Sequence, residues 1–254
     1  MPLVLRYSLI KRILGFFNLA LVRQDKFTKS ILPVDLELDL IFDVGANTGQ
    51  YGQKIRKAGY SGTIVSFEPI SSAHLKLLEA SQKDPKWLVH KRSAIGNING
   101  SAEIRVSSNS VSSSLLAMAD AHLNAAPESL YETSEAVEME TLNKIGATYF
   151  QGHQIIGLKI DVQGYEMEVL RGARDVLSKF DFIQLEMSLT ELYKGQVMYF
   201  EIDEYLRNFG FALWGMIPGF RDSRNGRLLQ YDGLYVSKRA LDILEEDKSP
   251  GKRK

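Results

Sequence analysis

Two acidic residues near the start of the chain have the spacing of a ligand site. Asp43 lies within an apolar run at 40–44, and the small-residue turn Gly45-Ala-Asn-Thr-Gly49 follows that run. Glu68 lies nineteen residues beyond Gly49 and directly follows a second apolar run, at 63–67. A strand that ends in small residues lets a bulky ligand lie against the backbone. An acid at the tip of the next strand can accept both hydroxyl hydrogens of a ribose, so this spacing predicts a nucleoside-binding crevice.

The turn differs from two better-known glycine-rich motifs. A dinucleotide fingerprint needs glycines at its first, third and sixth positions, whereas the glycines here are Gly45, Gly49 and Gly52. A dehydrogenase is therefore disfavoured, and no Gly-Lys-Ser/Thr follows to make a P-loop. The form D-x-G-A-N-x-G resembles motif I of methyltransferases that use S-adenosylmethionine (SAM), a ligand without phosphate groups. The alternative is a tight strand-to-helix turn that binds nothing.

A second pair of acids ends later apolar runs. Asp161 is followed by Val162-Gln-Gly164, and Glu186 ends the run at 181–186. Ligands of doubly wound sheets bind outside the carboxyl ends of the strands. We therefore expect Asp43, Glu68, Asp161 and Glu186 to lie along one rim. Each acid alone could equally be a structural residue or a helix cap, but four together favour a site.

Strands and helices alternate through the middle of the chain, which predicts a parallel sheet with helices on both faces. The predicted strands are 40–44, 63–67, 87–91, 135–141, 155–160, 181–186, 211–215 and 233–237, and the predicted helices are 48–58, 71–82, 164–178 and 199–209. The last two strands have no clear helix between them, which indicates an antiparallel pair at one edge. A hairpin is predicted around 97–100.

The serine-rich segment from Ser107 to Glu135 interrupts this alternation. A structureless loop of that length is uncommon in a compact domain and is often a lid or a binding loop. A flexible linker has the same composition, so ligand contact and linker remain equal alternatives.

Three motifs, in this order, resemble the FkbM family of SAM-dependent methyltransferases: IFDVGANTGQYG, IVSFEPISSAHLKLL and IGLKIDVQGYEMEVLRGA. The segments HKRSAIGNINGSAEI and FIQLEMS and the serine cluster before SLL also match its layout, and the resemblance covers about residues 38–237. It implies a Rossmann-like, class I fold and methylation of a hydroxyl group on a sugar, a glycan or a polyketide-type natural product. Where the family usually has D-V-E-G-x-E, this chain has Gln163, which weakens any role that needs a charge there, including metal ligation.

The resemblance also implies roles for individual residues. Glu68 would hold the ribose hydroxyls, and Pro69 would turn the chain away. Ser93 and Ala94 would lie beside the adenine. The residues that would line the methionine part of SAM are Asp43, Gly45, Ala46, Asn47 and Gly49.

An alcohol is a weak nucleophile, so methyl transfer to a hydroxyl group calls for a base or a metal ion. Asp161 is the first candidate for substrate contact, although it could also sit at the methionine amino group, and Glu186 is the second. His90 is the best general-base candidate among the histidines, although each histidine could instead be a structural residue with its hydrogen bonds satisfied. Lys159 is expected to pair with an acid. A divalent metal is an option that we do not expect. The rival from another class is a non-catalytic nucleoside-binding module.

Composition limits the remaining choices. The chain has 254 residues, enough for one well-buried domain, and Lys+Arg and Asp+Glu balance at 31 each, so no charge argues for nucleic acid. The absence of cysteine excludes thiolate chemistry, and no apolar run is long enough to span a membrane. We expect a cytoplasmic protein whose acceptor is a small molecule or a glycan.

The expected domain organisation has three parts. Residues 1–32 form a basic amphipathic helix, residues 33–240 the methyltransferase domain, and residues 241–254 a basic, disordered tail. The helix could pack on the domain or on the partner in a homodimer. Alternatively, residues 1–28 could lie on an anionic membrane surface.

Overall fold

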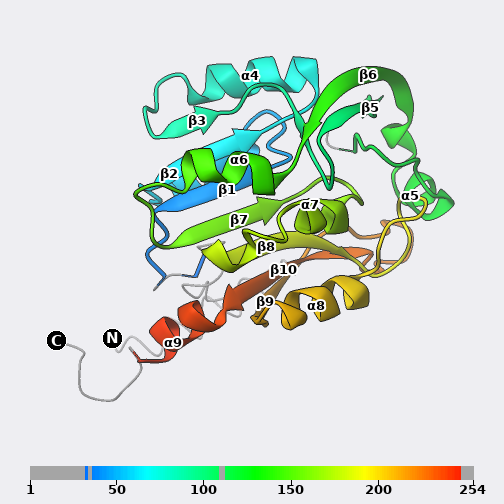
Figure 1. Cartoon of the computed structure of the whole chain (residues 1–254). Coiled ribbons are helices and arrows are strands. Elements are labelled where there is room, and N and C mark those ends of the chain that lie inside the picture. The colour runs from blue at the N-terminus through cyan, green and yellow to red at the C-terminus, as the bar shows by residue number, and fades with distance from the viewer. Residues whose placement is uncertain (1–31, 34–35, 109–111, 247–254) are drawn as a thin grey trace, which may run out of the picture. The chain divides into compact units, whose positions relative to one another are not determined.

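The computed structural model describes residues 32–33, 36–108 and 112–246, and its largest element is a seven-stranded sheet (Figure 1). The strand order is β3-β2-β1-β7-β8-β10-β9. The strands are β1 (Leu40–Val44), β2 (Thr63–Phe67), β3 (Trp87–Val89), β7 (Ile156–Ile160), β8 (Phe180–Ser188), β9 (Phe211–Pro218) and β10 (Gln230–Ser237). The first five of these run parallel, and the order reverses between β1 and β7. A ligand crevice is expected where the order reverses.

This topology confirms the predicted doubly wound, Rossmann-like α/β fold. Every residue of β1 and of β7 is buried, as expected for continuous apolar strands that are covered on both faces. Asp43 is opposite Ser66 on one side and Lys159 on the other. β10 pairs antiparallel with both β8 and β9, so the predicted antiparallel pair at the edge is also confirmed.

Four helices lie where the sequence predicts them: α3 (Gln50–Lys57), α4 (Ser71–Ser81), α7 (Glu166–Gly172) and α8 (Tyr199–Asn208). Helix α7 ends well before the predicted residue 178. The backbone N–H of Asp175 is donated to the side chain of Asn143 instead of continuing the helix. A 3₁₀ turn, Leu177–Lys179, then leads into β8.

Three described helices were not predicted: α5 (Asp120–Ala125), α6 (Leu142–Tyr149) and α9 (Lys238–Glu246). Helix α5 has only six residues, too few for a clear apolar period, whereas α9 has a clearly apolar face that was overlooked. Helix α9 buries Ala240 and Leu244. It runs through the boundary expected at residue 240, so the segment predicted as a tail begins inside a helix.

A small second sheet corrects the predicted hairpin at 97–100. It contains β4 (Ala94–Ile95), β5 (Gly100–Ser107) and β6 (Tyr131–Glu140), in the order β4-β6-β5. The chain does turn between β4 and β5, but these strands do not pair with each other. Both pair with β6, and Met139 is opposite Ala94 on one side and Gly100 on the other. The hairpin was wrong because a later strand inserts between its two arms.

The described part of the segment from Ser107 to Glu135 is folded, not a structureless loop. Ser114 forms a bridge with Arg105, and Met118 forms one with Tyr193. Met118 also packs with Leu192, Tyr193 and Leu229 in a small apolar cluster. In Figure 1 the part of this segment that includes α5 lies beyond the tip of β7.

The predicted N-terminal helix falls almost entirely on residues 1–31, which lie outside the described residues, as do residues 247–254. Across the described ranges, no helix is both long and apolar enough to cross a lipid bilayer.

Candidate functional site

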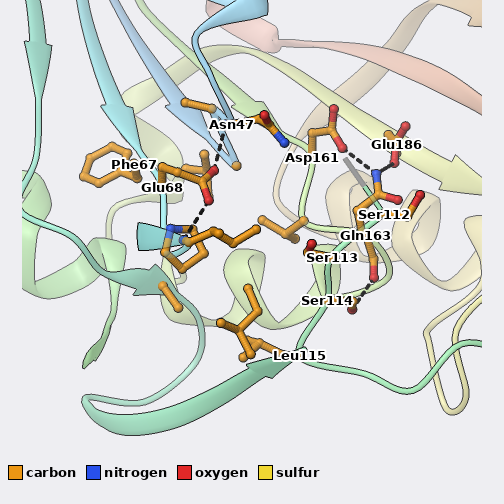
Figure 2. Close-up of a pocket in the computed structure, with 18 of the residues that line it drawn as sticks. Asn47, Phe67, Glu68, Ser112, Ser113, Ser114, Leu115, Asp161, Gln163 and Glu186 are labelled. Carbon is orange, nitrogen blue, oxygen red and sulfur yellow. Dashed lines mark hydrogen bonds between the residues drawn. The ribbon is translucent and has the colours of Figure 1, made fainter. Parts of the chain in front are cut away.

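A cavity of about 530 Å³ lies at the carboxyl ends of β1, β2, β7 and β8. Its wall comes from the turns after these strands, from the start of the second sheet and from the segment after β5. Figure 2 shows Glu68 on one side of the cavity and Asp161, Gln163 and Glu186 on the other. The structure therefore brings together acids that are far apart in the sequence.

Nine of the twelve residues proposed from the sequence line this cavity. They are Gly45, Ala46, Asn47, Glu68, Pro69, Ser93, Ala94, Asp161 and Glu186. Asp43, Gly49 and His90 are not among the lining residues.

Glu68 is buried and is held by the backbone on both of its oxygens. Its Oε2 accepts a hydrogen bond from the N–H of Asn47 at 2.7 Å, and its Oε1 accepts one from Ile70 at 2.8 Å (Figure 2). Asn47 has a positive φ of 47°, in the left-handed region that residues other than glycine seldom adopt. Burial raises the pKa of Glu68 to about 7, although the two backbone bonds oppose the shift.

Asp43 lies beneath the cavity wall and is 1% exposed. Ser66 Oγ donates to its Oδ2 at 3.2 Å, and Trp87 Nε1 donates to the same Ser66 oxygen. Its other oxygen, Oδ1, has no partner among the described residues. Burial raises the pKa of Asp43 to about 6. Asp43 therefore links β1 to Ser66 on the neighbouring strand β2.

The two glycines of the turn after β1 lie close to other residues and have positive φ angles, and both features disfavour a side chain at either position. Gly45 has a φ of 80°, and a Cβ atom there would lie 1.8 Å from the backbone oxygen of Asp161. Gly49 has a φ of 88° and packs on Trp87. Gly45 lets the turns after β1 and β7 meet, and Gly49 lets α3 pack on β3.

Gln163 joins the two acids on the far side of the cavity. Its Nε2 donates to Asp161 Oδ1 and to Glu186 Oε2, each at 2.7 Å (Figure 2). Its Oε1 accepts from the Tyr193 hydroxyl at 2.6 Å, and its backbone oxygen accepts from Ser114 Oγ at 2.6 Å. Gln163 has a positive φ of 55°, so several contacts hold it in an unusual conformation. Sequence reasoning recognised this residue only as a departure from the family pattern.

The pKa values of the two carboxyl groups in this cluster shift in opposite directions. Burial would raise the pKa of Asp161, but Lys159, whose Nζ lies 3.0 Å from Oδ2, and the Gln163 amide lower it below its usual range. Burial and the nearby charge of Asp161 raise the pKa of Glu186 well above its usual value. Asp161 therefore holds the negative charge, and Glu186 tends to hold a proton. The predicted pairing of Lys159 with an acid is confirmed.

His90 takes part in a separate cluster. Its Nδ1 is 2.8 Å from the Tyr149 hydroxyl, and its Nε2 is 3.0 Å from Glu140 Oε2. Lys91 and Lys144 also contact Glu140. Both ring nitrogens of His90 are thus engaged away from the cavity, which favours the structural alternative over the general-base role.

Several lining residues were not identified from the sequence. Ser112, Ser113 and Ser114 line the cavity and are buried, which supports the ligand-contact alternative for the serine cluster. His122 on α5 and Phe220 also line it. No motif surrounds either of these two, so a sequence pattern could not have found them. Within the described ranges, no group of three or more His, Asp or Glu residues is arranged to hold a metal ion.

Three solved structures resemble this chain at low sequence identity. The FkbM methyltransferase from Methylobacillus flagellatus is 15% identical with a TM-score of 0.48; the match covers 83% of this chain and 47% of that one, about half its length. Fibrillarin from Aeropyrum pernix, solved with S-adenosyl-L-methionine, is 12% identical with a TM-score of 0.43. The match covers 81% of this chain and 69% of fibrillarin. Magnesium protoporphyrin IX methyltransferase from Synechocystis, solved with bound SAM, is 11% identical with a TM-score of 0.42. The match covers 78% of this chain and 70% of that one.

A comparison with curated protein sequences found no match. The model of the methyltransferase FkbM domain matches residues 43–213. That span runs from β1 into β9 and contains every lining residue of the cavity except Phe220 and Gln230. The chain therefore belongs to the FkbM family of methyltransferases.

Proposed function

We propose that this protein is a SAM-dependent O-methyltransferase that acts on a hydroxyl group of a sugar, a glycan or a polyketide-type natural product. The observation that carries the proposal is the placement of Glu68 opposite the Asp161–Gln163–Glu186 cluster, across one cavity at the reversal point of the sheet. Family membership supplies the reaction type. The hydroxyl acceptor is the part that rests on the resemblance.

The residues on one side of the cavity fit SAM. Each oxygen of Glu68 accepts one backbone hydrogen bond and keeps a lone pair that could accept from a ribose hydroxyl. Ser93 Oγ is buried and has no partner among the described residues, so an adenine nitrogen would satisfy it. Ala94 and Ile95 add apolar wall beside it. Gly45 and the residues that follow it would border the methionine end.

When bound, SAM supplies an electrophilic methyl group, and the protein must orient the acceptor and receive its proton. The side chain of Asp161 is 35% exposed, and its low pKa keeps it ionised. We assign Asp161 to contact with the acceptor hydroxyl, with Gln163 and Lys159 holding its orientation. The proposal assigns no metal, because the Gln163 amide already donates to both carboxylates.

Titration calorimetry with SAM tests the cofactor part of this proposal. Glu68→Ala should weaken binding by about ten- to a hundredfold, since each lost hydrogen bond to a charged acceptor contributes about 1.5–3 kcal/mol. Glu79→Ala, at an exposed position on α4, is the matched control and should bind normally. Unchanged affinity in a folded Glu68→Ala protein would remove the SAM assignment.

Methyl transfer from labelled SAM to a panel of sugars and macrolides tests the reaction itself. Asp161→Asn keeps the size of the side chain and should lower turnover at least about a hundredfold if Asp161 assists proton transfer. Melting temperature is measured on the same samples. SAM binding by the wild type without any methylated product would favour the non-catalytic module. Full turnover with lost stability in Asp161→Asn would make Asp161 a structural acid.

A further inference from the structure

The part of the cavity formed by α5 and the serine segment has no role in the fit to SAM. We infer that His122 binds the methyl acceptor there, and that this subsite selects an uncharged, hydroxyl-bearing molecule. The inference rests on the proposed function and adds a binding residue and a charge preference to it.

His122 is a buried histidine whose hydrogen-bonding capacity is unmet. It lies on α5, is 4% exposed and lines the cavity. Neither ring nitrogen has a hydrogen-bond partner within the described parts of the chain. A buried polar group left unsatisfied is destabilising, and folded proteins rarely contain one. A histidine that borders a cavity in this condition is typical of a residue that contacts a ligand.

The surroundings of His122 suit an alcohol. Its ring packs edge-on against Tyr193, with centroids 5.1 Å apart, and lies 5.6 Å from the ring of Phe220. Burial lowers the pKa of His122, so the imidazole is neutral at neutral pH. A neutral imidazole has one donor and one acceptor, and a hydroxyl group can pair with either.

Tyr193 also connects this region to the acids. Its hydroxyl donates to Gln163 Oε1, and the Gln163 amide donates to Asp161 and Glu186. His122 therefore packs on a side chain that is one hydrogen bond away from Gln163, the residue that bridges the acids. The acceptor subsite and the acids form one connected part of the cavity.

The charges on the cavity wall disfavour an anion. Four acids line it, whereas Lys159 is the single Lys or Arg among the described lining residues, and it is paired with Asp161. Because Asp161 already pairs with Lys159, a phosphate or carboxylate on the acceptor would find no free cation among the described lining residues. The cavity wall also includes the side chains of Ser112, Ser129 and Phe220, and the Phe220 ring lies beside His122. This combination matches a sugar ring, with polar edges and C–H faces.

Histidine NMR on the SAH-saturated protein, where SAH is S-adenosylhomocysteine, tests the inference. The chain has four histidines, so ¹⁵N-histidine labelling gives few signals, and His122→Gln identifies the one from His122. The probes are methyl α-D-glucopyranoside and methyl α-L-rhamnopyranoside, with glucose 6-phosphate as the anionic counterpart. Either glycoside should shift the His122 signal, and glucose 6-phosphate should bind roughly tenfold more weakly or not at all.

The variants separate binding of the acceptor from binding of SAH. His122→Gln should weaken glycoside binding roughly tenfold, the loss of about one hydrogen bond, without changing SAH affinity. His153→Gln is the matched control, because His153 lies near Asp39 and does not line the cavity. The inference is overturned if neither glycoside shifts the His122 signal or if the phosphate binds as tightly as the glycosides. Failure of the wild type to bind SAH would instead overturn the proposed function and, with it, the inference.

Discussion

Replacing Gln163 with glutamate should turn the bridge between two acids into a repulsive contact. The Gln163 amide donates to Asp161 and to Glu186, each at 2.7 Å. A carboxylate of the same shape has no hydrogen to donate, so both bonds are lost. The bond to ionised Asp161 contributes about 1.5–3 kcal/mol and the bond to Glu186 about 1 kcal/mol, so we expect a loss of about 2.5–4 kcal/mol in the free energy of unfolding.

The pH dependence of this loss has a definite sign. The new carboxyl group would lie beside the negative charge of Asp161, which raises its pKa in the folded protein above the unfolded value of about 4.3. The folded state then binds the extra proton more tightly than the unfolded state does. Stability from this proton is present at low pH and is lost as the pH rises through the folded pKa. The difference in free energy of unfolding between the wild type and Gln163→Glu should therefore be larger at about pH 8 than at about pH 5.

Urea unfolding at about pH 5 and at about pH 8, followed by tryptophan fluorescence, measures this difference in the free energy of unfolding. Gln53→Glu is the matched control, because Gln53 is exposed on α3 and the substitution adds the same charge. The control should stay within about 0.5 kcal/mol of the wild type at either pH. An equal loss for Gln163→Glu at pH 5 and pH 8 would refute the charge argument. No loss at all would show that the Gln163 bridge does not stabilise the site.

Two further predictions concern the opposite wall of the cavity. Because burial raises the pKa of Glu68 to about 7, and ribose hydroxyls bind the ionised carboxylate better, SAH affinity should rise between about pH 6 and pH 8. Calorimetry across that range should show a flatter profile for Glu68→Gln; an identical slope would assign the titration to another group. Gly45→Ala would place a Cβ atom against the backbone of Asp161, whereas Gly59→Ala, also at a positive φ, meets nothing within 4 Å. Thermal and urea unfolding should show Gly45→Ala to be less stable than Gly59→Ala by at least about 1–3 kcal/mol, and equal losses would mean that the backbone at Gly45 can move.

The sequence was sufficient for the strands at the centre of the sheet and for the acids at their ends. The strands β1 and β7 are apolar except for Asp43 and Lys159, and a parallel strand buried on both faces leaves that local signature. The carboxyl ends of such strands meet at one edge, so Glu68, Asp161 and Glu186 could be placed together without knowing any distance. This part of the prediction needed only the local hydrophobic pattern and the rule that ligands bind at the carboxyl ends of parallel strands.

The pairings between distant segments were decided only by the tertiary structure. β6 inserts between β4 and β5, which separates the arms of a hairpin that the local sequence favours. His90 has the residue type and position of a base, but Tyr149 and Glu140 occupy both of its nitrogens. In these cases a partner tens of residues away determines the outcome, and no local pattern encodes that partner.

The acceptor side of the cavity depends most strongly on the tertiary structure. Gln163 is a single departure from a motif in the sequence, but in the folded protein it bridges two acids and accepts a hydrogen bond from Tyr193. His122 and Phe220 come from segments without periodicity, and both line the cavity. Strand ends follow from the hydrophobic pattern, because burial of a strand is a local property. Contacts between side chains on separate loops follow from how those loops cross, which only the packed chain determines.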